Sequence, residues 1–361
     1  MKTGAGAPRR RVRFGIVNLL FSTNQTARIL PTGKAFPVLP ISVNHCGRLF
    51  SLRIQPVANY KRIERRLGVT KSPEVTCEII CEIDQGDAEF FNEVIDNVCY
   101  VLSVASGTKV NWLYGHFYND GDQCTNYSHR EAITKPFVPL STIPLDDAHI
   151  KEFVEGAYAT YVGRKADFAL DQGVVDAYLD ARSDVDYLQM RGAKLAVALE
   201  MLKSVFLSIP EAPIGSHILP PQDFKEMRKD IKDAIGKVLK SRRIDEQTRA
   251  IMYQGIDELD RRPFMSILQG LFRYLDLRLD DKELRQFVDS RNKLVHEGRF
   301  YCEVATDDEK KTWPFGSPRE EYRFMLGLLD RVYLRLLGYD GPYIDWSSVR
   351  GPVHRDRVNY T

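Results

Sequence analysis

The hydrophobic pattern of this chain of 361 residues changes at about residue 145. Before that point, apolar side chains recur near every second position in segments 51–58 and 75–83, and an aromatic segment follows at 110–118. Such alternation is typical of strands with one buried face. From Phe90 to Val101, by contrast, apolar residues recur every three or four positions, which indicates a helix. The first part of the chain is therefore predicted to be an α+β domain.

Beyond residue 145 the pattern is helical almost throughout, up to about residue 338. Pro136, Pro139 and Pro144 interrupt the chain just before this part and indicate a linker. Helices are expected near residues 147–161, 166–181, 185–207, 222–240, 245–259, 264–278, 280–297 and 318–337. We therefore predict three parts: an N-terminal α+β domain at 1–145, an all-α helical bundle at 146–345 and a C-terminal tail at 346–361.

Charge and apolar runs exclude several classes of protein. The chain has 51 basic and 49 acidic residues, so any contact with nucleic acid must be local. No apolar run reaches the roughly 18 residues that a membrane span needs. The arginines at 9–13 precede the apolar segment 14–21, but Asn18 and the lack of a cleavage site argue against a signal peptide. We expect a cytoplasmic protein with no membrane partner. The arginines at 9–13 form a track for an RNA backbone or a disordered solubilising tail, of which the tail is favoured, and an early strand or packed segment follows them.

The six cysteines give no sign of a metal site. They include no Cys-x-x-Cys pair and no nearby histidine at ligand spacing, so we expect neither a metal nor a cofactor. Cys77 and Cys81 lie in a strand-like segment. Buried thiols in a reducing compartment are the expected state.

The predicted helix 280–297 carries a charge on its apolar side. Its apolar stripe consists of Leu284, Phe287, Val288 and Val295. A polar row beside that stripe consists of Arg285, Asp289, Asn292 and His296. Arg291 follows Leu284 by two turns and so lies within the apolar stripe, where a surface helix has no need of a guanidinium. Asn292 and His296, four positions apart, are neighbours on one face.

Arg291, Asn292 and His296 are therefore the candidate catalytic residues. His296 lies in the last turn before Gly298, so the negative end of the helix dipole favours its imidazolium form. Arg291 offers a planar fork for phosphate oxygens. Together these groups fit RNA cleavage without a metal, with the imidazole moving protons and the guanidinium neutralising charge on phosphorus. The alternative is structural: Arg291 pairs with a buried acid, Asn292 bonds to the backbone and His296 caps the helix.

The segment Arg291-Asn-Lys-Leu-Val-His296 has the form Arg-x4-His with a polar residue after the arginine, and it resembles the signature of HEPN domains, many of which are ribonucleases. Segments 195–202 and 328–343 together resemble the Apea-like branch of that family, over roughly residues 185–343. Segment 98–112 is similar to the N-terminal domains that accompany such HEPN domains. The resemblance implies a HEPN-type bundle that dimerises around two Arg-His motifs. Some toxin members have a tyrosine where this chain has Gly298.

Other residues have two open interpretations. Glu200 interrupts an apolar helix, where it supports the site by pairing with Arg291 or else meets solvent or Lys203. The basic segment 225–243 forms an RNA track or a solvated helix face, and its RNA-binding candidates are Lys229, Lys232, Lys237, Lys240, Arg242 and Arg243. Two roles are open for the aromatic residues of segment 110–118: they stack on RNA bases, or they pack in the core or a domain interface. These residues are Trp112, Tyr114, Phe117 and Tyr118.

The favoured hypothesis is a metal-independent endoribonuclease, in an antiviral or toxin-like role, whose partner is RNA. It is expected to be a homodimer through the helical domain, with Arg291, Asn292 and His296 lining the groove between subunits. The N-terminal domain would sense a trigger, bind a regulatory partner or hold the nuclease inactive. The alternative is a noncatalytic HEPN protein that acts in dimerisation or nucleotide binding.

Overall fold

The computed structural model describes residues 9–22, 26–29, 35–70, 72–84, 88–118, 124–129, 137–138, 140–183, 186–210, 212–348 and 351–359. Pro136 and Pro139 of the predicted linker, and the side chains of Arg9 and Arg10, lie outside the described part. No helix in these ranges combines the length and apolar character that a membrane span requires.

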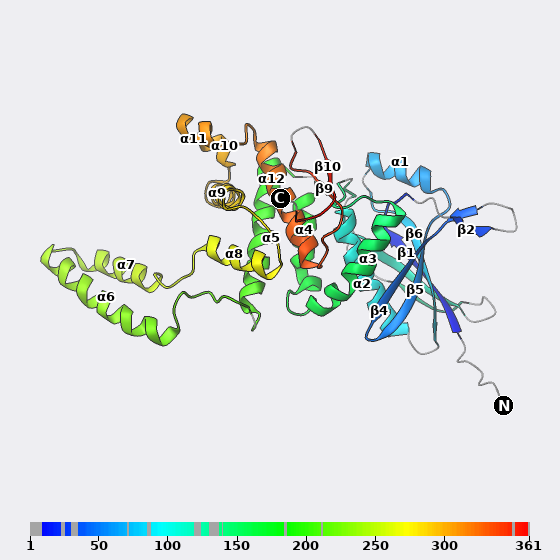
Figure 1. Ribbon diagram of the computed structural model, residues 1–361, viewed down its shortest axis with the longest axis horizontal. Coiled ribbons are helices and arrows are strands. Elements are labelled where there is room, and N and C mark those ends of the chain that lie inside the picture. The colour runs from blue at the N-terminus through cyan, green and yellow to red at the C-terminus, as the bar shows by residue number, and fades with distance from the viewer. Residues whose placement is uncertain are drawn as a thin grey trace, which may run out of the picture.

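An antiparallel sheet of six strands forms the N-terminal part, in the order β4-β5-β6-β1-β7-β8 (Figure 1). Its strands are β1 (Arg9–Val17), β4 (Leu39–His45), β5 (Arg48–Pro56), β6 (Val75–Asp84), β7 (Asn111–Tyr118) and β8 (Cys124–His129). A separate pair is formed by β2 (Thr26–Ile29) and β3 (Ala35–Pro37). The strands expected at 51–58, 75–83 and 110–118 are thus confirmed.

Side chains alternate along β1 between the inner face of the sheet, which packs against helices, and its outer face. Val12, Phe14 and Ile16 are fully buried toward the helices, whereas Arg11 and Arg13 point to the opposite face. The arginine cluster is therefore part of a central strand, not a solubilising tail, because β1 pairs with both β6 and β7. The early strand expected after the cluster is the second half of this same strand.

Two helices pack on the inner face of the sheet. The helix expected at 90–101 is α2 (Ala88–Ser106), and the first predicted helix of the bundle is α3 (Asp147–Arg164). α2 packs against β7 and α3, and α3 packs against β4 (Figure 1). A further helix, α1 (Tyr60–Thr70), lies beside β6 and was not predicted.

The rest of the chain is mostly helical, as expected. Its longer helices are α4 (Val175–Arg182), α5 (Leu188–Ser208), α6 (Pro221–Ser241), α7 (Glu246–Asp257), α8 (Phe264–Tyr274), α9 (Asp281–Glu297) and α12 (Pro318–Leu336). Two short helices, α10 (Tyr301–Val304) and α11 (Asp307–Thr312), were not predicted. Of the helix expected at 166–181 only the second half forms, as α4. Residues 165–169 form turns, and the chain kinks within Leu170–Val174, where Gly173 adopts a φ of 110°.

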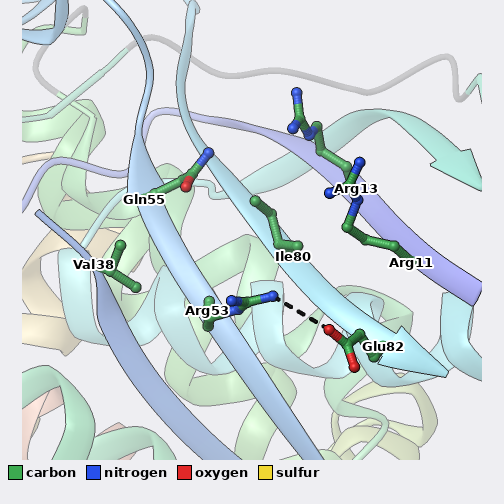
Figure 2. Close-up of a pocket in the computed structure, with 7 residues that line it drawn as sticks. All are labelled: Arg11, Arg13, Val38, Arg53, Gln55, Ile80 and Glu82. Atoms are coloured by element: carbon green, nitrogen blue, oxygen red, sulfur yellow. Dashed lines mark ion pairs between the residues drawn. The ribbon is translucent and has the colours of Figure 1, made fainter. Parts of the chain in front are cut away.

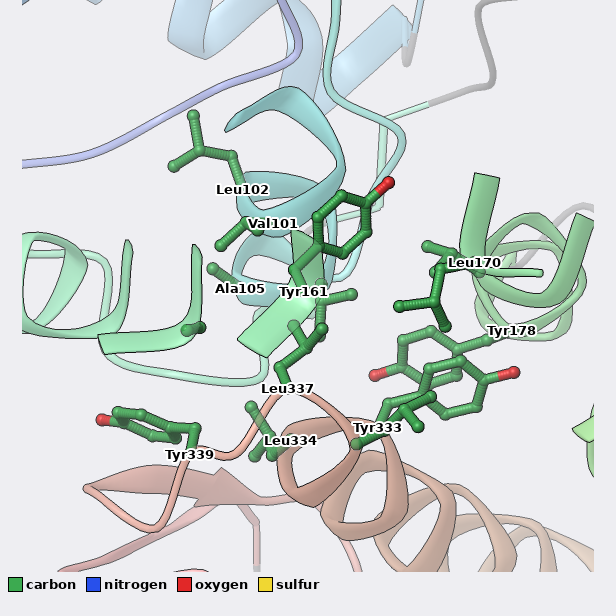
Figure 3. Close-up of a cluster of buried hydrophobic side chains, with 14 of the residues drawn as sticks. Val101, Leu102, Ala105, Tyr161, Leu170, Tyr178, Tyr333, Leu334, Leu337 and Tyr339 are labelled. Atoms are coloured by element: carbon green, nitrogen blue, oxygen red, sulfur yellow. The ribbon is translucent and has the colours of Figure 1, made fainter. Parts of the chain in front are cut away.

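One buried core runs from the sheet to the last long helix, across the predicted boundary at residue 145. In Figure 3, side chains of α2 and Tyr161 of α3 lie near Tyr178 and Tyr333, from α4 and α12. The rings of Tyr178 and Tyr333 stack with centroids 4.1 Å apart. Beside Tyr178 the buried Arg182 pairs with Asp330 and donates to the Leu140 carbonyl. The sheet and the helices therefore share one hydrophobic interior.

The predicted C-terminal tail folds back onto the molecule. Within it β10 (Val353–Arg355) pairs antiparallel with β9 (Tyr343–Asp345), and Val358 is fully buried. Asn359 Nδ2 donates to the Asp276 carbonyl at 2.8 Å. The described part of this segment is thus structured and contacts the loop between α8 and α9.

Candidate functional site

The helix that carries the Arg-x4-His motif begins and ends at clear signals. At its start Asp280 and Glu283 form a capping box, in which Glu283 N donates to Asp280 Oδ1 at 2.6 Å. At its end Gly298 adopts the left-handed conformation with φ 68°, as expected, and its N–H donates to the Leu294 carbonyl at 3.1 Å. The helix predicted at 280–297 is confirmed as α9.

A glycine on α5 brings α5 and α9 close together. A Cβ at Gly192 would lie 2.7 Å from the ring of Phe300 and 3.0 Å from Leu294 Cδ1, so only glycine fits this contact. Leu294 and Phe300 are buried there, whereas Val295 is 46% exposed. Val295 therefore does not belong to the buried stripe that was predicted, because α5 packs on the Leu294 side of α9.

Arg291 is held at the edge of the α5–α9 contact. Its Nη2 pairs with Glu200 Oε1 of α5, and its Nη1 donates to Asn292 Oδ1 at 2.9 Å. The guanidinium also lies over the ring of Phe264 at the start of α8, 4.8 Å from the centroid. The Arg291 side chain is 16% exposed and that of Glu200 27% exposed. The guanidinium is thus positioned by contacts from three helices.

Both interpretations of Glu200 are present at once. Its Oε1 pairs with Arg291, and its Oε2 accepts from Lys203 one turn further along α5. Lys203 also lies over the ring of Phe264, at 5.0 Å from the centroid. The sequence did not single out Phe264, because an aromatic residue at the start of a helix usually only packs in the core.

His296 lies at the opposite side of the motif. Five positions separate it from Arg291, which is about 140° around a helix of 3.6 residues per turn. The imidazole is exposed. Across the described ranges it makes no hydrogen bond or ion pair, including to Arg291 or Asn292. The helix is capped by Gly298 and not by the histidine, so capping does not account for His296.

The polar row beside His296 includes one carboxyl group with a changed pKa. Asp289 is exposed, but partial desolvation by its neighbours raises its pKa, and the nearby Arg285 opposes that rise. Asp289 lies three positions before Asn292 and so shares this side of α9. The row therefore contains an acid that holds its proton to a higher pH than an ordinary aspartate.

A buried glutamate fixes the chain just after the motif. Glu321 of α12 is fully buried and accepts from the backbone N–H groups of Tyr301 and Cys302, each at 2.9 Å. It also accepts from Trp313 Nε1 at 3.3 Å. The sequence did not indicate a role for Glu321, because a glutamate in the first turn of a helix is usually solvated. It positions the segment that follows Gly298.

The predicted RNA track is located elsewhere. Its residues lie on or just after α6, which with α7 forms a hairpin projecting from the body, separate from α9 (Figure 1). Lys232 is half-buried, and the exposed members are Lys229, Lys237, Lys240, Arg242 and Arg243. The structure therefore does not bring these side chains to the Arg-x4-His motif.

The aromatic strand β7 is divided between two faces. Trp112 and Phe117 are buried in the core against Phe14, with ring centroids 5.2 and 5.9 Å from it. Tyr114 and Tyr118 are half-buried on the other face. Burial is thus the outcome for two of the four aromatic residues.

Within the described ranges no group of three or more histidine, cysteine, aspartate or glutamate side chains is arranged to hold a metal ion. Cys77, Cys81 and Cys99 are buried, as expected for the first two, and Cys46 and Cys124 are exposed. Comparison of the chain with protein-family models, with curated proteins and with solved structures finds no match.

Proposed function

We propose that this protein is a metal-independent endoribonuclease of HEPN type, with Arg291, Asn292 and His296 as its catalytic residues. The observation that carries the proposal is the exposed imidazole of His296, which has no internal partner in the described chain and stands at the negative end of α9. The resemblance of Arg291–His296 to the HEPN signature supports the same assignment.

The chemistry follows from the imidazole of His296 and the guanidinium of Arg291. A 2′-hydroxyl attacks the adjacent phosphorus, the 5′-oxygen leaves, and a 2′,3′-cyclic phosphate remains. His296 removes the hydroxyl proton or protonates the leaving oxygen. Arg291 neutralises the charge that develops on the phosphorane oxygens, and Asn292 orients the guanidinium through its Oδ1 contact.

Glu200 has a supporting role in this proposal. It holds Arg291 in place in the free protein, and a phosphate that reaches the guanidinium competes with the carboxylate for it. Lys203 already shares the charge of Glu200, which lowers the cost of losing Arg291 as a partner.

Exposed apolar side chains beside this ion pair favour a homodimer. Val197 lies one turn before Glu200 and is 53% exposed, and Val295 lies one turn after Arg291 and is 46% exposed. Since Glu200 and Arg291 meet, the two valines flank the same contact. Met190, 54% exposed, extends the patch along α5. A two-fold interface over this patch would cover the apolar residues and bring two motifs together.

The test is cleavage of a labelled single-stranded RNA in the presence of a chelator. The wild-type protein should leave 2′,3′-cyclic phosphate ends and should not cut an all-DNA strand, which lacks the attacking hydroxyl. His296→Ala should abolish cleavage while melting temperature and circular dichroism stay close to wild type. Arg291→Ala should also abolish cleavage; its circular dichroism should stay close to wild type, and its melting temperature should fall because the Glu200 pair is lost. His354→Ala, at an exposed histidine of β10, is the matched control and should cleave normally.

The second candidate is a noncatalytic HEPN module for dimerisation or nucleotide binding. The ion pair between Arg291 and Glu200 favours it, because a structural arginine needs such a partner. Intact RNA under all conditions, together with a dimer that Val295→Asp dissociates, would support this candidate. If the His354→Ala variant still cleaves RNA and the His296→Ala variant does not, the noncatalytic candidate is excluded. In the nuclease proposal the N-terminal sheet domain senses a trigger, binds a regulatory partner or holds the nuclease inactive.

A further inference from the structure

The outer face of the sheet, opposite α2 and α3, carries arginines on two strands and aromatic rings on a third. The backbone register aligns Arg53 of β5, Ile80 of β6, Arg13 of β1 and His116 of β7 in one row across the sheet. The next row includes Arg11 of β1 opposite Tyr118 of β7. Side chains in such rows share one face, because successive residues of a strand alternate.

A cavity of about 290 Å³ opens on this face between β5 and β1 (Figure 2). Three guanidinium groups line it, from Arg11, Arg13 and Arg53, against the single carboxylate of Glu82. Arg53 lies 3.8 Å from Glu82, and Arg13 lies 3.6 Å from Glu78. Both distances exceed those of a hydrogen bond, and within the described residues Arg13 Nε is buried with no hydrogen-bond partner. The cavity is therefore suited to an anion that accepts hydrogen bonds.

Three rings lie beside this cavity on β7. Tyr114 and His116 stack with centroids 4.8 Å apart, and Tyr118 follows them two positions later. Gly15 permits this arrangement, since a Cβ there would lie 2.3 Å from the Tyr114 ring. Arg11 connects the two features, because its guanidinium lies over the Tyr118 ring at 5.4 Å from the centroid. All three rings are half-buried, which leaves part of each accessible.

We propose that this outer face binds single-stranded RNA, with phosphates at Arg13 and Arg53 and bases stacked on His116 and Tyr118. The proposal rests on the proposed ribonuclease function for its choice of RNA and assigns the sheet domain a part in substrate capture. Guanidinium groups beside aromatic rings are the combination that binds unpaired nucleotides, since phosphates need charge and every base has a face for stacking. A duplex hides its bases and cannot use the rings.

The test measures RNA binding and not cleavage, so its outcome does not depend on whether the protein is a nuclease. Fluorescence anisotropy with a labelled oligouridylate is measured on the full chain carrying His296→Ala. In that background, Arg13→Ala with Arg53→Ala should raise Kd at least about tenfold and reduce its salt dependence. Tyr118→Ala should raise Kd about fivefold or more, and Tyr118→Phe should restore binding because the ring is retained.

Lys237→Ala with Lys240→Ala is the matched control, because it also removes two cationic groups, from exposed positions on α6. Unchanged binding there and weakened binding in the sheet variants support the proposal. The reverse pattern would overturn it and place RNA along α6. Competition by unlabelled single strands but not by duplex RNA or uridine monophosphate is expected. Equal competition by the monophosphate would instead make the cavity a nucleotide pocket.

Failure of the two proposals can be told apart. If wild-type protein cuts RNA and the sheet variants bind it normally, the outer-face proposal alone is wrong. If wild-type protein cuts no RNA but binding still depends on Arg13, Arg53 and Tyr118, the nuclease proposal fails and the RNA-binding face remains.

Discussion

Glu200 illustrates how one side chain takes two partners when helix packing brings them together. Its carboxylate lies between Arg291 of α9 and Lys203 of its own helix, and all three side chains are partly shielded from solvent. A single carboxylate between two cations stabilises both, and its loss would leave the 16%-exposed guanidinium without its acidic partner.

Glu200→Gln and Arg291→Gln should therefore each lower the free energy of unfolding by about 1–3 kcal/mol. The double variant should lose less than the sum, with a coupling of about 1 kcal/mol or more in urea denaturation. The exposed pair Lys293–Glu297 is the control, with an expected coupling of only about 0.3–0.5 kcal/mol. Strict additivity at Glu200 and Arg291 would contradict the assigned contact.

The thiols of the buried Cys81 and the half-buried Cys302 should make the stability of the protein depend on pH in the alkaline range. Burial raises the pKa of Cys81 to about 12 and, together with the nearby Glu321, raises that of Cys302 to about 12. An unfolded thiol titrates near 8.5, so above that pH the unfolded chain has lost protons that the folded chain retains. The free energy of unfolding should then fall as the pH rises from about 8.5 toward 10.

The midpoints of urea unfolding, measured under reducing conditions at a series of pH values, test this predicted fall in stability. A Cys81→Ala, Cys302→Ala variant should lose less stability over the same interval. The interval ends near pH 10, because unfolded tyrosines titrate above it. A flat profile in the wild-type protein would contradict the raised pKa values of these two thiols.

At the scale of the element, α9 is defined at both ends by local signals and placed by a single close contact. The capping box at Asp280 and the left-handed Gly298 determine where it starts and stops. Gly192 determines how near it lies to α5. The motif residues are thus presented by a helix whose length is set locally and whose orientation is set by packing.

Gly298→Ala should lower the free energy of unfolding by about 1 kcal/mol, since an L-residue adopts φ 68° at a cost. The effect is conformational, because a Cβ there meets nothing within 4 Å. Gly156→Ala, in the interior of α3 and equally open, is the matched control and should raise stability by about 0.5–1 kcal/mol. Thermal or urea unfolding measures the stability change of each variant. Equal effects of the two substitutions would rule out the left-handed conformation of Gly298 as the cause.

For the whole molecule, the shared core predicts a single unfolding transition. The buried pair Arg182–Asp330 joins α4 to α12, and Arg182 also holds the Leu140 carbonyl of the segment that follows the sheet. The hydrophobic interior continues from α2 to α12 without a break. The shared core includes α2, α3, α4, α5, α8, α9 and α12, so the described sheet and these helices should unfold together.

A variant with Trp313→Phe and Trp346→Phe retains Trp112 as the only tryptophan, located in the sheet. Its fluorescence and the far-UV circular dichroism of the helices should give one coincident urea midpoint. Arg182→Met should shift both midpoints together, with a loss of about 3–5 kcal/mol, because Asp330 would stay buried without its partner. Two separate transitions would show instead that the parts fold independently.

Local patterns alone determined the order of most secondary structure. The alternation in β6 and the three-to-four spacing in α9 are properties of neighbouring residues, so the strand at 75–83 and the helix at 280–297 could be predicted closely. Even the left-handed conformation of Gly298 follows from its place after the last turn. The catalytic role of Arg291 and His296 was inferred from spacing and resemblance, and it stays a prediction.

Only the tertiary structure decided which distant residues meet. It selected Glu200 as the partner of Arg291, added Phe264 and the buried Glu321, and placed the arginines of β1 beside the rings of β7. It also decided that Val295 is exposed and that β1 is central. The reason is physical: side-chain period sets which face of an element is apolar, but burial depends on the packing of elements far apart in the chain.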